Sequence, residues 1–322
     1  MNNTYVGHEK QTCGVDEMRL VGGKGDGMRM LHVRNGLGLE FFVSLDRCAD
    51  ISRLTLKGDN FGYFAPCGYV APQYYDDKGA GFLKSFTAGF ITTCGLTAVG
   101  TPCTDAGEDL PLHGTISNTP AESFGYWTAA DGLHIKAIIR DAAIFGRQLV
   151  LEREYVVSLE KNEIAMTDKV TNIGSSESPL EMLYHCNTGY PLLSEKAIIE
   201  IPSTEVAPRN DHAKEGIDTC LVCEVPQNGY EEMCFYHKLS GKTQVSIKNP
   251  AIGKGLTIAY DTAELPCFTQ WKMMGEYEYV MGLEPGNCLP DGRRVMREKG
   301  ILEFLAPGAS KTHHLQFIFT EV

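Results

Sequence analysis

Short runs in which apolar and polar residues alternate recur along the chain, and this period of two is typical of half-buried β-strands. The clearest runs cover residues 39–45, 134–140, 149–159, 163–172, 196–201, 243–249, 255–260, 300–306 and 312–319. Turn-forming sequences such as Asn-Gly at 35–36 separate them, and turns of this kind join antiparallel neighbours. The best candidates for helices are 8–18 and 208–215, and neither carries a sustained helical stripe. The pattern predicts an all-β fold.

The predicted strands continue at similar spacing from residue 28 onward, and no linker rich in proline or serine interrupts them. We therefore predict a single domain over residues 1–322, with its core at about 28–319, built as a large antiparallel β-sandwich of two layers. The longest interval without a clear strand is 58–124, which is rich in glycine, threonine and aromatic residues. Because long structured loops on a rigid sandwich commonly carry binding sites, we expect this interval to border the functional site.

Composition narrows the class of protein. The 322 residues are 43% hydrophobic and 22% charged, which is typical of a soluble globular protein with a large core. The net charge of -12 and the lack of a basic cluster exclude nucleic acid as a partner. The polar opening sequence is not a leader peptide, and no run approaches the roughly 20 apolar residues of a membrane helix. Eleven scattered cysteines indicate a reducing compartment, so we predict a cytoplasmic protein without a membrane partner and leave its oligomeric state open.

One histidine stands out from this β pattern. His185 follows an apolar run in "EMLYHCNTGY", residues 181–190, where a strand is about to end. At that place its side chain would point into a groove, held by its neighbours Tyr184 and Asn187. The alternative is a structural role, because an isolated buried histidine is more often a hydrogen-bonded core residue than a catalyst.

Two further motifs combine a chemically active residue with a backbone that can approach a ligand. His113 stands before Gly114 in "LHGTISNTPAE", and a glycine there lets a backbone or a ligand come close to the imidazole. Glu284 ends an apolar strand in "YVMGLEPGN", where partial desolvation should raise its pKa toward that of a general base. Alternatively, Glu284 only closes a turn and His113 only hydrogen-bonds its own loop.

These three motifs, in this order and with these intervals, resemble the galactose mutarotase-like (aldose 1-epimerase) superfamily. The His-Gly-x-x-x-Asn-x-Pro pattern and the Glu-Pro-Gly sequence are similar to its hexose-phosphate mutarotases, and the whole chain resembles a less characterised bacterial branch. The resemblance covers about residues 28–319 and implies a β-supersandwich whose concave face binds a sugar. It also implies that His185 is the general acid, Glu284 the general base and His113 a histidine that orients the substrate.

The chemistry itself requires an acid and a base. To interconvert the anomers of a cyclic hemiacetal, a base takes the proton of the anomeric hydroxyl while an acid protonates the ring oxygen, and the ring opens and recloses. A carboxylate and an imidazole that titrate near neutral pH serve in both directions. We therefore expect a near-neutral pKa for His185 and no cofactor. A divalent ion held by His113, His185 and Glu284 is the alternative.

Recognition of the substrate is less defined by the sequence. The hexose-phosphate relatives have an arginine where this chain offers only Lys84 nearby, so phosphate recognition is left open. Arg47 could aim its planar donors at sugar hydroxyls or a carboxylate, or could instead pair with Asp46 or Asp50. The other candidate substrate ligands are Asn187, Lys272 and Asp211.

Three classes of function remain. The first is an enzyme that interconverts the anomers of an aldose, and the second is an isomerase or epimerase that moves protons at carbon in a keto-sugar or sugar acid. The third is a carbohydrate-binding protein without catalysis, which would need exposed aromatic platforms. The chain offers only Trp127 and Trp271 for that purpose, and Trp271 lies inside an apparent strand. Because an acid-base pair favours catalysis, we predict an isomerase of the aldose 1-epimerase type.

Overall fold

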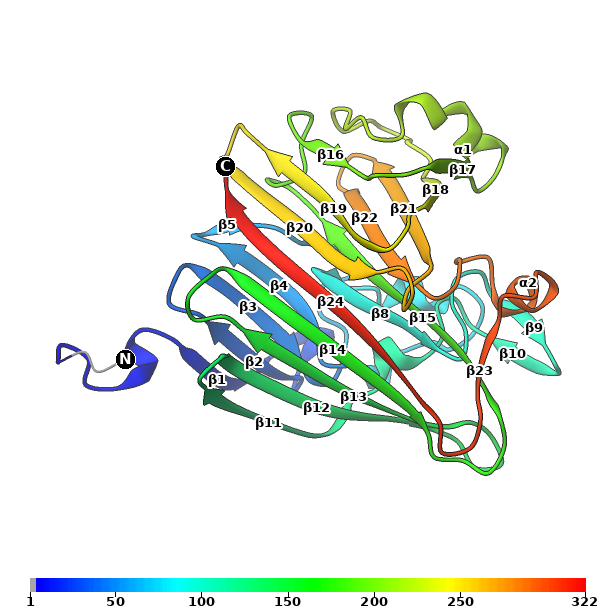
Figure 1. The fold of residues 1–322 in the computed structure, drawn as a ribbon, viewed down its shortest axis with the longest axis horizontal. Coiled ribbons are helices and arrows are strands. Elements are labelled where there is room, and N and C mark those ends of the chain that lie inside the picture. The colour runs from blue at the N-terminus through cyan, green and yellow to red at the C-terminus, as the bar shows by residue number, and fades with distance from the viewer. Residues whose placement is uncertain (1–3) are drawn as a thin grey trace.

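The computed structural model describes residues 4–322, and β-strands dominate it (Figure 1). One layer is an eight-stranded antiparallel sheet. Its strands are, in spatial order, β11 (Ala121–Ala129), β12 (Gly132–Ala142), β13 (Gln148–Val157), β14 (Glu163–Asn172), β24 (Ser310–Glu321), β20 (Lys254–Asp261), β19 (Lys242–Asn249) and β16 (Ile198–Glu200).

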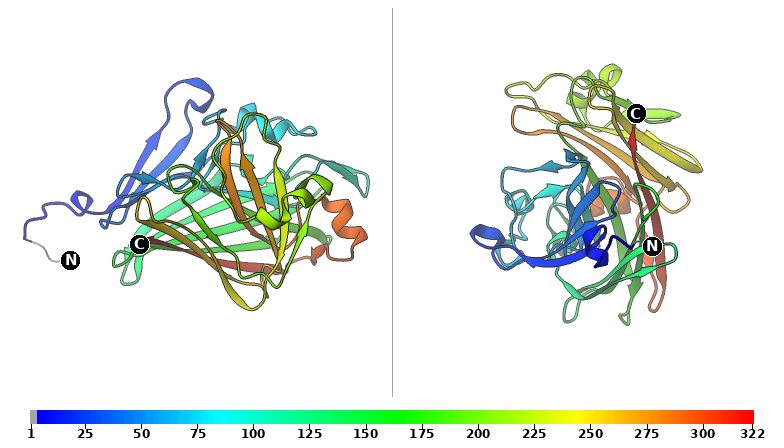
Figure 2. Two further views of the ribbon diagram at one scale, coloured as in Figure 1. Left: turned by 90° about the horizontal axis from the view of Figure 1, so that it is seen from above. Right: turned by 90° about the vertical axis from the view of Figure 1, so that its left-hand side faces the viewer.

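A seven-stranded sheet lies over part of this layer, and a five-stranded sheet near the N-terminus lies beside it (Figure 2). The seven strands are β17 (Glu205–Pro208), β18 (Met233–Lys238), β21 (Cys267–Met274), β22 (Tyr279–Gly286), β15 (Ser178–Thr188) and β23 (Glu303–Leu305), with β8 (Ile91–Leu96) also paired to β15. The five strands are β1 (Gly14–Arg19), β2 (Arg29–Arg34), β3 (Leu39–Ser44), β4 (Asp50–Leu56) and β5 (Asp59–Asn60). Two small ladders join β6 (Tyr63–Phe64) to β7 (Ala88–Gly89) and β9 (Cys103–Asp105) to β10 (Glu108–Leu110).

Helices are short. The α-helices are α1 (Asp211–Glu215) and α2 (Arg293–Glu298), and the 3₁₀ turns are Glu9–Gln11, Gly23–Gly25, Pro72–Tyr74, Gly81–Lys84, Ile116–Asn118 and Ile217–Thr219. The helix predicted near 208–215 is confirmed by α1, but the one near 8–18 is wrong, because Val15 is buried on β1 and pairs with β2. No helix within residues 4–322 has the length and apolar character needed to span a bilayer.

The core fills the space between the large sheet and the two sheets that cover it. Inward side chains of the large sheet, such as Ile135 and Phe317, belong to one continuous apolar cluster with Phe41 of β3 and Tyr184 of β15. Figures 1 and 2 show the large sheet as a curved layer with the other strands stacked against one face. The predicted antiparallel all-β sandwich is therefore confirmed.

Strand alternation separates the core from a second, polar face on β15 and β22. Tyr184 and Cys186 point into the apolar cluster, whereas His185 lies between them in sequence and points to the opposite side. On β22, Leu283 belongs to the same cluster and its neighbour Glu284 points away from it. The period of two thus brings one histidine and one carboxyl group onto the same face of two paired strands.

The interval 58–124 differs from its predicted description as a region without strands, because it contains β5 to β10. Strand β8 is buried along its whole length, so its sequence shows no alternation of apolar and polar residues. It pairs with β15, and its Thr92 is opposite His185. The interval therefore supplies one strand of the seven-stranded sheet, here called the site sheet. Its residues Phe82, Phe86 and His113 also line a cavity on that sheet.

Candidate functional site

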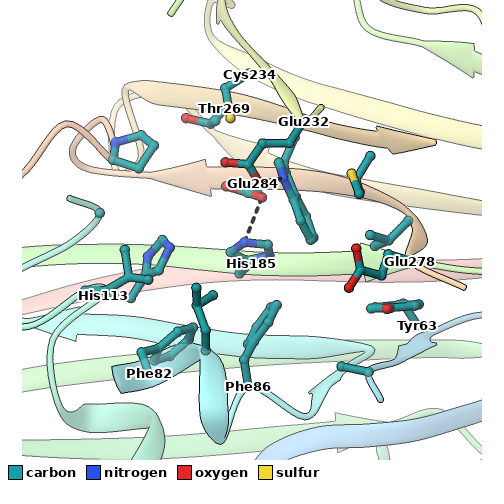
Figure 3. Close-up of a pocket in the computed structure, with 18 of the residues that line it drawn as sticks. Tyr63, Phe82, Phe86, His113, His185, Glu232, Cys234, Thr269, Glu278 and Glu284 are labelled. Carbon is teal, nitrogen blue, oxygen red and sulfur yellow. Dashed lines mark hydrogen bonds and ion pairs between the residues drawn. The ribbon is translucent and has the colours of Figure 1, made fainter. Parts of the chain in front are cut away.

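A cavity of about 560 Å³ opens on the polar face of β15, β22, β21 and β18 (Figure 3). Its wall is largely aromatic, and its polar groups come from separate parts of the chain. The aromatic residues are Tyr63, Phe82, Phe86 and Trp271, and the polar residues include His113, His185, Arg209, Glu232, Thr269, Glu278 and Glu284. Such an enclosed space with a few convergent polar groups is characteristic of small-molecule sites.

His185 and Glu284 face each other inside this cavity. Their atoms Nε2 and Oε1 are 3.2 Å apart, and both side chains are almost fully buried. On the other side of the ring, Nδ1 lies 2.6 Å from the amide oxygen of Asn187, whose own Nδ2 donates to the carbonyl oxygen of His185. An amide oxygen only accepts, so Nδ1 carries a proton and donates it to Asn187. In neutral His185, Nε2 therefore presents its lone pair to Glu284.

Burial determines where the proton of this pair resides. Desolvation raises the pKa of Glu284 well above its ordinary value, and the nearby carboxylate of Glu232 acts in the same direction while Arg209 opposes it. Desolvation also lowers the pKa of His185 to about 4, opposed by the hydrogen bond with Asn187. Burial therefore favours the uncharged forms of both groups, a neutral imidazole and a protonated carboxyl group. The expected near-neutral pKa of His185 is wrong because the imidazole is buried more deeply than a residue at a groove edge.

The carboxyl group of Glu284 lies in a tight space that the sequence provides locally. A Cβ atom at Gly282 would collide with Oε1 of Glu284, so a larger residue there would displace the carboxyl group. Although Nε2 of His185 is close, it is not aligned for a hydrogen bond, and Oε1 has no such partner within residues 4–322. Thr269, which is paired with Glu284 across β21 and β22, also has a buried hydroxyl without a partner there. These atoms are available to substrate oxygens.

His113 reaches the same cavity from the long interval before β11. Its ring centre is 5.6 Å from that of His185 and 5.1 Å from that of Phe82. Its φ of 59° and that of Gly114, 71°, belong to a tight turn in which the His113 carbonyl accepts from the Gly95 amide. Burial lowers the pKa of His113 well below its ordinary value, so it is neutral. The structure thus brings together all three residues of the sequence motifs.

Arg47, a predicted substrate ligand, does not line this cavity. Its buried guanidinium donates to three backbone carbonyls, those of Ser117 (2.6 Å), Val70 (2.8 Å) and Ser85 (2.8 Å). Burial lowers its pKa to about 10. The predictions that Arg47 contacts a substrate or pairs with Asp46 or Asp50 are therefore wrong. Its hydrogen bonds connect three loop segments instead.

The other predicted ligands also differ from the expectation in their placement. Lys272 is buried on the opposite face of β21, where its Nζ donates to Glu224 (2.9 Å), because it is one residue out of phase with the residues that face the cavity. Asp211 is exposed at the start of α1 and does not line the cavity. Asn187 does not line the cavity either. It lies behind His185 and orients the imidazole ring, so it could affect a ligand only indirectly.

Several cavity residues were missed by the sequence analysis or, like Trp271, considered only as an aromatic platform and set aside. They are Arg209, Glu232, Cys234, Thr269 and Trp271. A usable signal existed for Thr269 and Trp271, because the turn between β21 and β22 sets Thr269 opposite Glu284 and so assigns the alternate residues of β21 to the cavity. No comparable local signal marks Arg209, whose side chain contacts residues distant in sequence.

Metal binding has no structural support in the part of the chain that is described. Within residues 4–322, no group of three or more His, Cys, Asp or Glu side chains is arranged to hold a metal ion, and this includes the alternative set of His113, His185 and Glu284. The candidate site thus consists of the close pair of His185 and Glu284, accompanied by polar groups that can hold a ligand.

Comparisons with known proteins agree with this architecture. The family model described as a domain of unknown function, DUF4432, matches residues 25–318. No curated protein matches the chain. Among solved structures, a protein of Klebsiella pneumoniae described as a candidate aldose 1-epimerase is 27% identical, with a TM-score of 0.90 over 95% of this chain and 83% of that one.

Two more distant structures show the fold alone. A galactose mutarotase-like protein of Clostridium acetobutylicum is 13% identical, with a TM-score of 0.72 over 97% of this chain and 100% of that one. A galactose 1-epimerase of Lactobacillus acidophilus is 12% identical, with a TM-score of 0.65 over 96% of this chain and 99% of that one. The chain therefore belongs to the DUF4432 family and has the fold of the galactose mutarotase-like superfamily.

Proposed function

We propose that this protein interconverts the anomers of a small sugar by acid-base catalysis, with His185 and Glu284 as the catalytic pair. The observation that carries the proposal is the 3.2 Å approach of Nε2 to Oε1 inside a largely aromatic cavity. The reaction moves protons on two oxygens bonded to the same carbon, the anomeric hydroxyl and the ring oxygen. Two groups this close can each reach one of them.

Ring opening uses the proton distribution of the buried pair. Neutral His185 accepts the proton of the anomeric hydroxyl at Nε2, while protonated Glu284 gives its proton to the ring oxygen. The bond between the anomeric carbon and the ring oxygen breaks, and the anomeric C=O bond forms. The pair is then an imidazolium and a carboxylate, which attract each other strongly in a desolvated site.

Ring closure is the reverse after rotation of the free aldehyde. The carboxylate of Glu284 takes the proton of the hydroxyl, whose oxygen attacks the carbonyl carbon from its other face, and His185 returns a proton to the carbonyl oxygen. This assignment differs from the one expected from the sequence, in which His185 protonates the ring oxygen and Glu284 deprotonates the anomeric hydroxyl. In the proposed cycle His185 serves the anomeric oxygen and Glu284 the ring oxygen in both directions, because burial favours a neutral imidazole and a protonated carboxyl group.

The other cavity residues support a sugar as the ligand. The rings of Trp271 and Phe86 each have their centre 5.2 Å from that of His185 and offer apolar surfaces to the C–H groups of a sugar. Thr269 and His113 supply polar atoms for hydroxyl groups. All eleven cysteines are free, which supports a protein that works in the cytoplasm.

Exchange NMR with the purified protein tests this function. A panel of reducing sugars in D₂O is followed for exchange between anomeric signals and for deuterium at carbon. We expect rapid exchange between anomers and no deuterium at carbon. Deuterium uptake at carbon would instead identify an isomerase acting on C–H bonds, and binding without either process would identify a carbohydrate-binding protein.

A further inference from the structure

Arg209 brings a positive charge to the cavity. It follows β17, and its backbone amide donates to the carbonyl of Cys234 on β18 (3.0 Å), which places its side chain beside the site sheet. Among the residues that line the cavity it is the one lysine or arginine. Its side chain is 28% exposed, so the guanidinium is neither sealed in the core nor free in solvent.

The guanidinium of Arg209 makes its close contacts through Nη2 and Nε, and only a weak one through Nη1. Nη2 donates to the hydroxyl of Thr101 (2.7 Å) and to the carbonyl of Pro290 (3.2 Å), and Nε lies 3.6 Å from Asp291. In contrast, Nη1 has a single weak contact, 3.9 Å to the sulfur of Cys234. The side chain is therefore held in position while Nη1 keeps donors without an oxygen acceptor from the described chain.

The charge of Arg209 is only partly compensated. Its single ion pair within residues 4–322 is with Asp291, and that carboxylate also lies 3.0 Å from Nζ of Lys299 and accepts from the hydroxyl of Tyr236. Two cations thus share one carboxylate. Burial raises the pKa of Glu284 and so disfavours a negative charge there, and the positive charge of Arg209 opposes this rise.

The negative side chains of the cavity have other positions. The carboxylate of Glu232 accepts a hydrogen bond from the indole of Trp271 (2.6 Å). Figure 3 shows Glu278 beside Tyr63, on the side of His185 opposite His113. Arg209 donates to the hydroxyl of Thr101, and the preceding residue, Gly100, accepts from the amide of His113 (3.0 Å), so Arg209 and His113 lie toward the same end. Arg209 thus forms no ion pair with Glu232 or Glu278 in the described chain, and these two carboxylates can accept hydrogen bonds from hydroxyl groups.

We propose that Arg209 binds a carboxylate group of the substrate, so that the substrate class of this site is a cyclic sugar acid of the uronic type. This inference rests on the proposed function and defines its substrate. One guanidinium with a free donor edge matches a single negative charge in geometry and in number. A phosphate dianion would need a second cation, and the cavity lining contains none.

Matched pairs of sugars test this inference. Anomer exchange is measured by NMR for glucuronate against glucose, galacturonate against galactose, and glucose 6-phosphate against both. We expect at least about a tenfold preference in kcat/KM for the uronates, the range of one charge-assisted hydrogen bond. Arg209→Gln should lower kcat/KM for the uronates about ten- to a hundredfold more than for the neutral sugars, mainly through KM.

Additional variants distinguish recognition from loss of structure. Arg209→Lys keeps the charge but loses the planar donors, so its preference should be intermediate. If Arg209→Gln fails to fold, Thr101→Val removes the hydroxyl that orients Nη2 and should weaken the preference. Lys84→Gln is the matched control, because this exposed cation pairs with Asp76 and does not line the cavity, so the preference should be unchanged.

Two measurements distinguish failure of the inference from failure of the proposed function. Uronate binding is measured by calorimetry with Glu284→Gln, in which no anomer exchange is expected, and anomer exchange is measured with the wild type. Uronate binding that depends on Arg209, without anomer exchange in the wild type, would refute the proposed function and retain the inference. Anomer exchange with neutral sugars or sugar phosphates equal to or faster than with uronates would overturn the inference and retain the function. An equal loss for all sugars in Arg209→Gln, or no uronate binding, would also overturn the inference.

Discussion

Two buried histidines have the same lowered pKa of about 4 and serve different purposes. His185 faces Glu284 across an open cavity, whereas His313 on β24 lies in the core next to Tyr184. The core cluster around His313 contains Arg153, which donates to both Asp50 and Asp168. Within residues 4–322, no lysine or arginine forms an ion pair with the carboxyl group of Glu284.

The two regions differ in whether their buried carboxyl groups are paired and in whether a ligand can reach them. In the core, Arg153 offsets the buried carboxylates, and Thr93 and Tyr184 donate further hydrogen bonds to them. In the cavity, Oε1 of Glu284 has no hydrogen-bond partner in the described chain and borders open space. The core carboxylates Asp50 and Asp168 are thus paired, although Nε2 of His313 has no hydrogen-bond partner in the described chain. An unpaired polar group that borders a cavity, in contrast, marks a place for a ligand. Two adjacent residues of β15 belong to the two regions, Tyr184 to the core and His185 to the cavity.

The largest expected effect is in the core cluster. Arg153→Met leaves Asp50 and Asp168 buried without their cation, so the free energy of unfolding should fall by about 3–5 kcal/mol. Denaturant unfolding measures this loss. Arg140→Met, which removes an exposed ion pair with Glu122, is the control and should cost about 1 kcal/mol or less. Equal effects of the two variants would remove the structural half of the comparison.

In the cavity, Glu284→Gln should lower the rate of anomer exchange by about a hundredfold or more, because the amide cannot transfer the proton. Stability should not fall. The folded pKa of Glu284 is raised, so the unfolded state gains by ionising as the pH rises above about 4.5, and glutamine removes this loss of stability.

Glu181→Gln is the matched control for that variant. Glu181 is also buried, with a pKa raised to about 8, but it does not line the cavity. Its replacement should leave anomer exchange close to that of the wild type. A similar loss of activity in both variants would mean that Glu284 acts through the fold rather than through chemistry.

In one property the two regions should agree. His185 and His313 keep folded pKa values of about 4, below the ordinary value of 6.5, so below pH 6.5 the unfolded state binds protons that the folded state does not. Each histidine should therefore lower stability by about 1.5 kcal/mol between pH 6.5 and 5, while the raised pKa values of the buried Glu284 and Glu181 act in the opposite direction, so the contribution of a histidine is the difference between the wild type and its variant. Denaturant unfolding at the two pH values measures it. Replacing either histidine by asparagine should weaken the fall, and a fall unchanged in both variants would contradict their burial as neutral groups.

The smallest effect concerns the group that orients His185. Asn187→Asp puts a carboxylate 2.6 Å from Nδ1, which should raise the pKa of His185 and move the acidic limb of the pH-rate profile upward by at least about one unit. Asn228→Asp, at an exposed position, is the control and should move nothing. A profile that does not shift would mean that Asn187 does not act through the imidazole.

The strands and the three residues of the cavity could be predicted because each has its signal within a short segment of the sequence. Alternation in runs such as 149–159 reports one buried face directly, and His113, His185 and Glu284 each occur in a distinctive short motif. The choice of Lys272 instead of Trp271 is an error of one residue in strand parity. Counting from the hairpin turn after β21 would have corrected it.

Other features depend on contacts between distant segments, which no local pattern reveals. Arg209 is oriented by Thr101 and Pro290, which lie more than 80 residues away in sequence. The deep burial of His185 depends on Phe86 and Trp271, which come from different parts of the chain, so its lowered pKa could not be predicted from "MLYHCNTG". Arg47 was predicted to bind the substrate or to pair with Asp46 or Asp50, because the three carbonyls that it binds come from segments distant in sequence.

The pH dependence of kcat/KM for anomer exchange tests most directly whether a buried pair sharing one proton is the catalyst. Because kcat/KM reports the free enzyme, the rate should stay constant from neutral pH down to about pH 5 and fall only near pH 4, where His185 becomes protonated. A basic limb should follow the ionisation of Glu284, at a pKa well above the ordinary carboxyl range. A rate already halved at about pH 6.5, the ordinary value for an exposed histidine, would contradict the account.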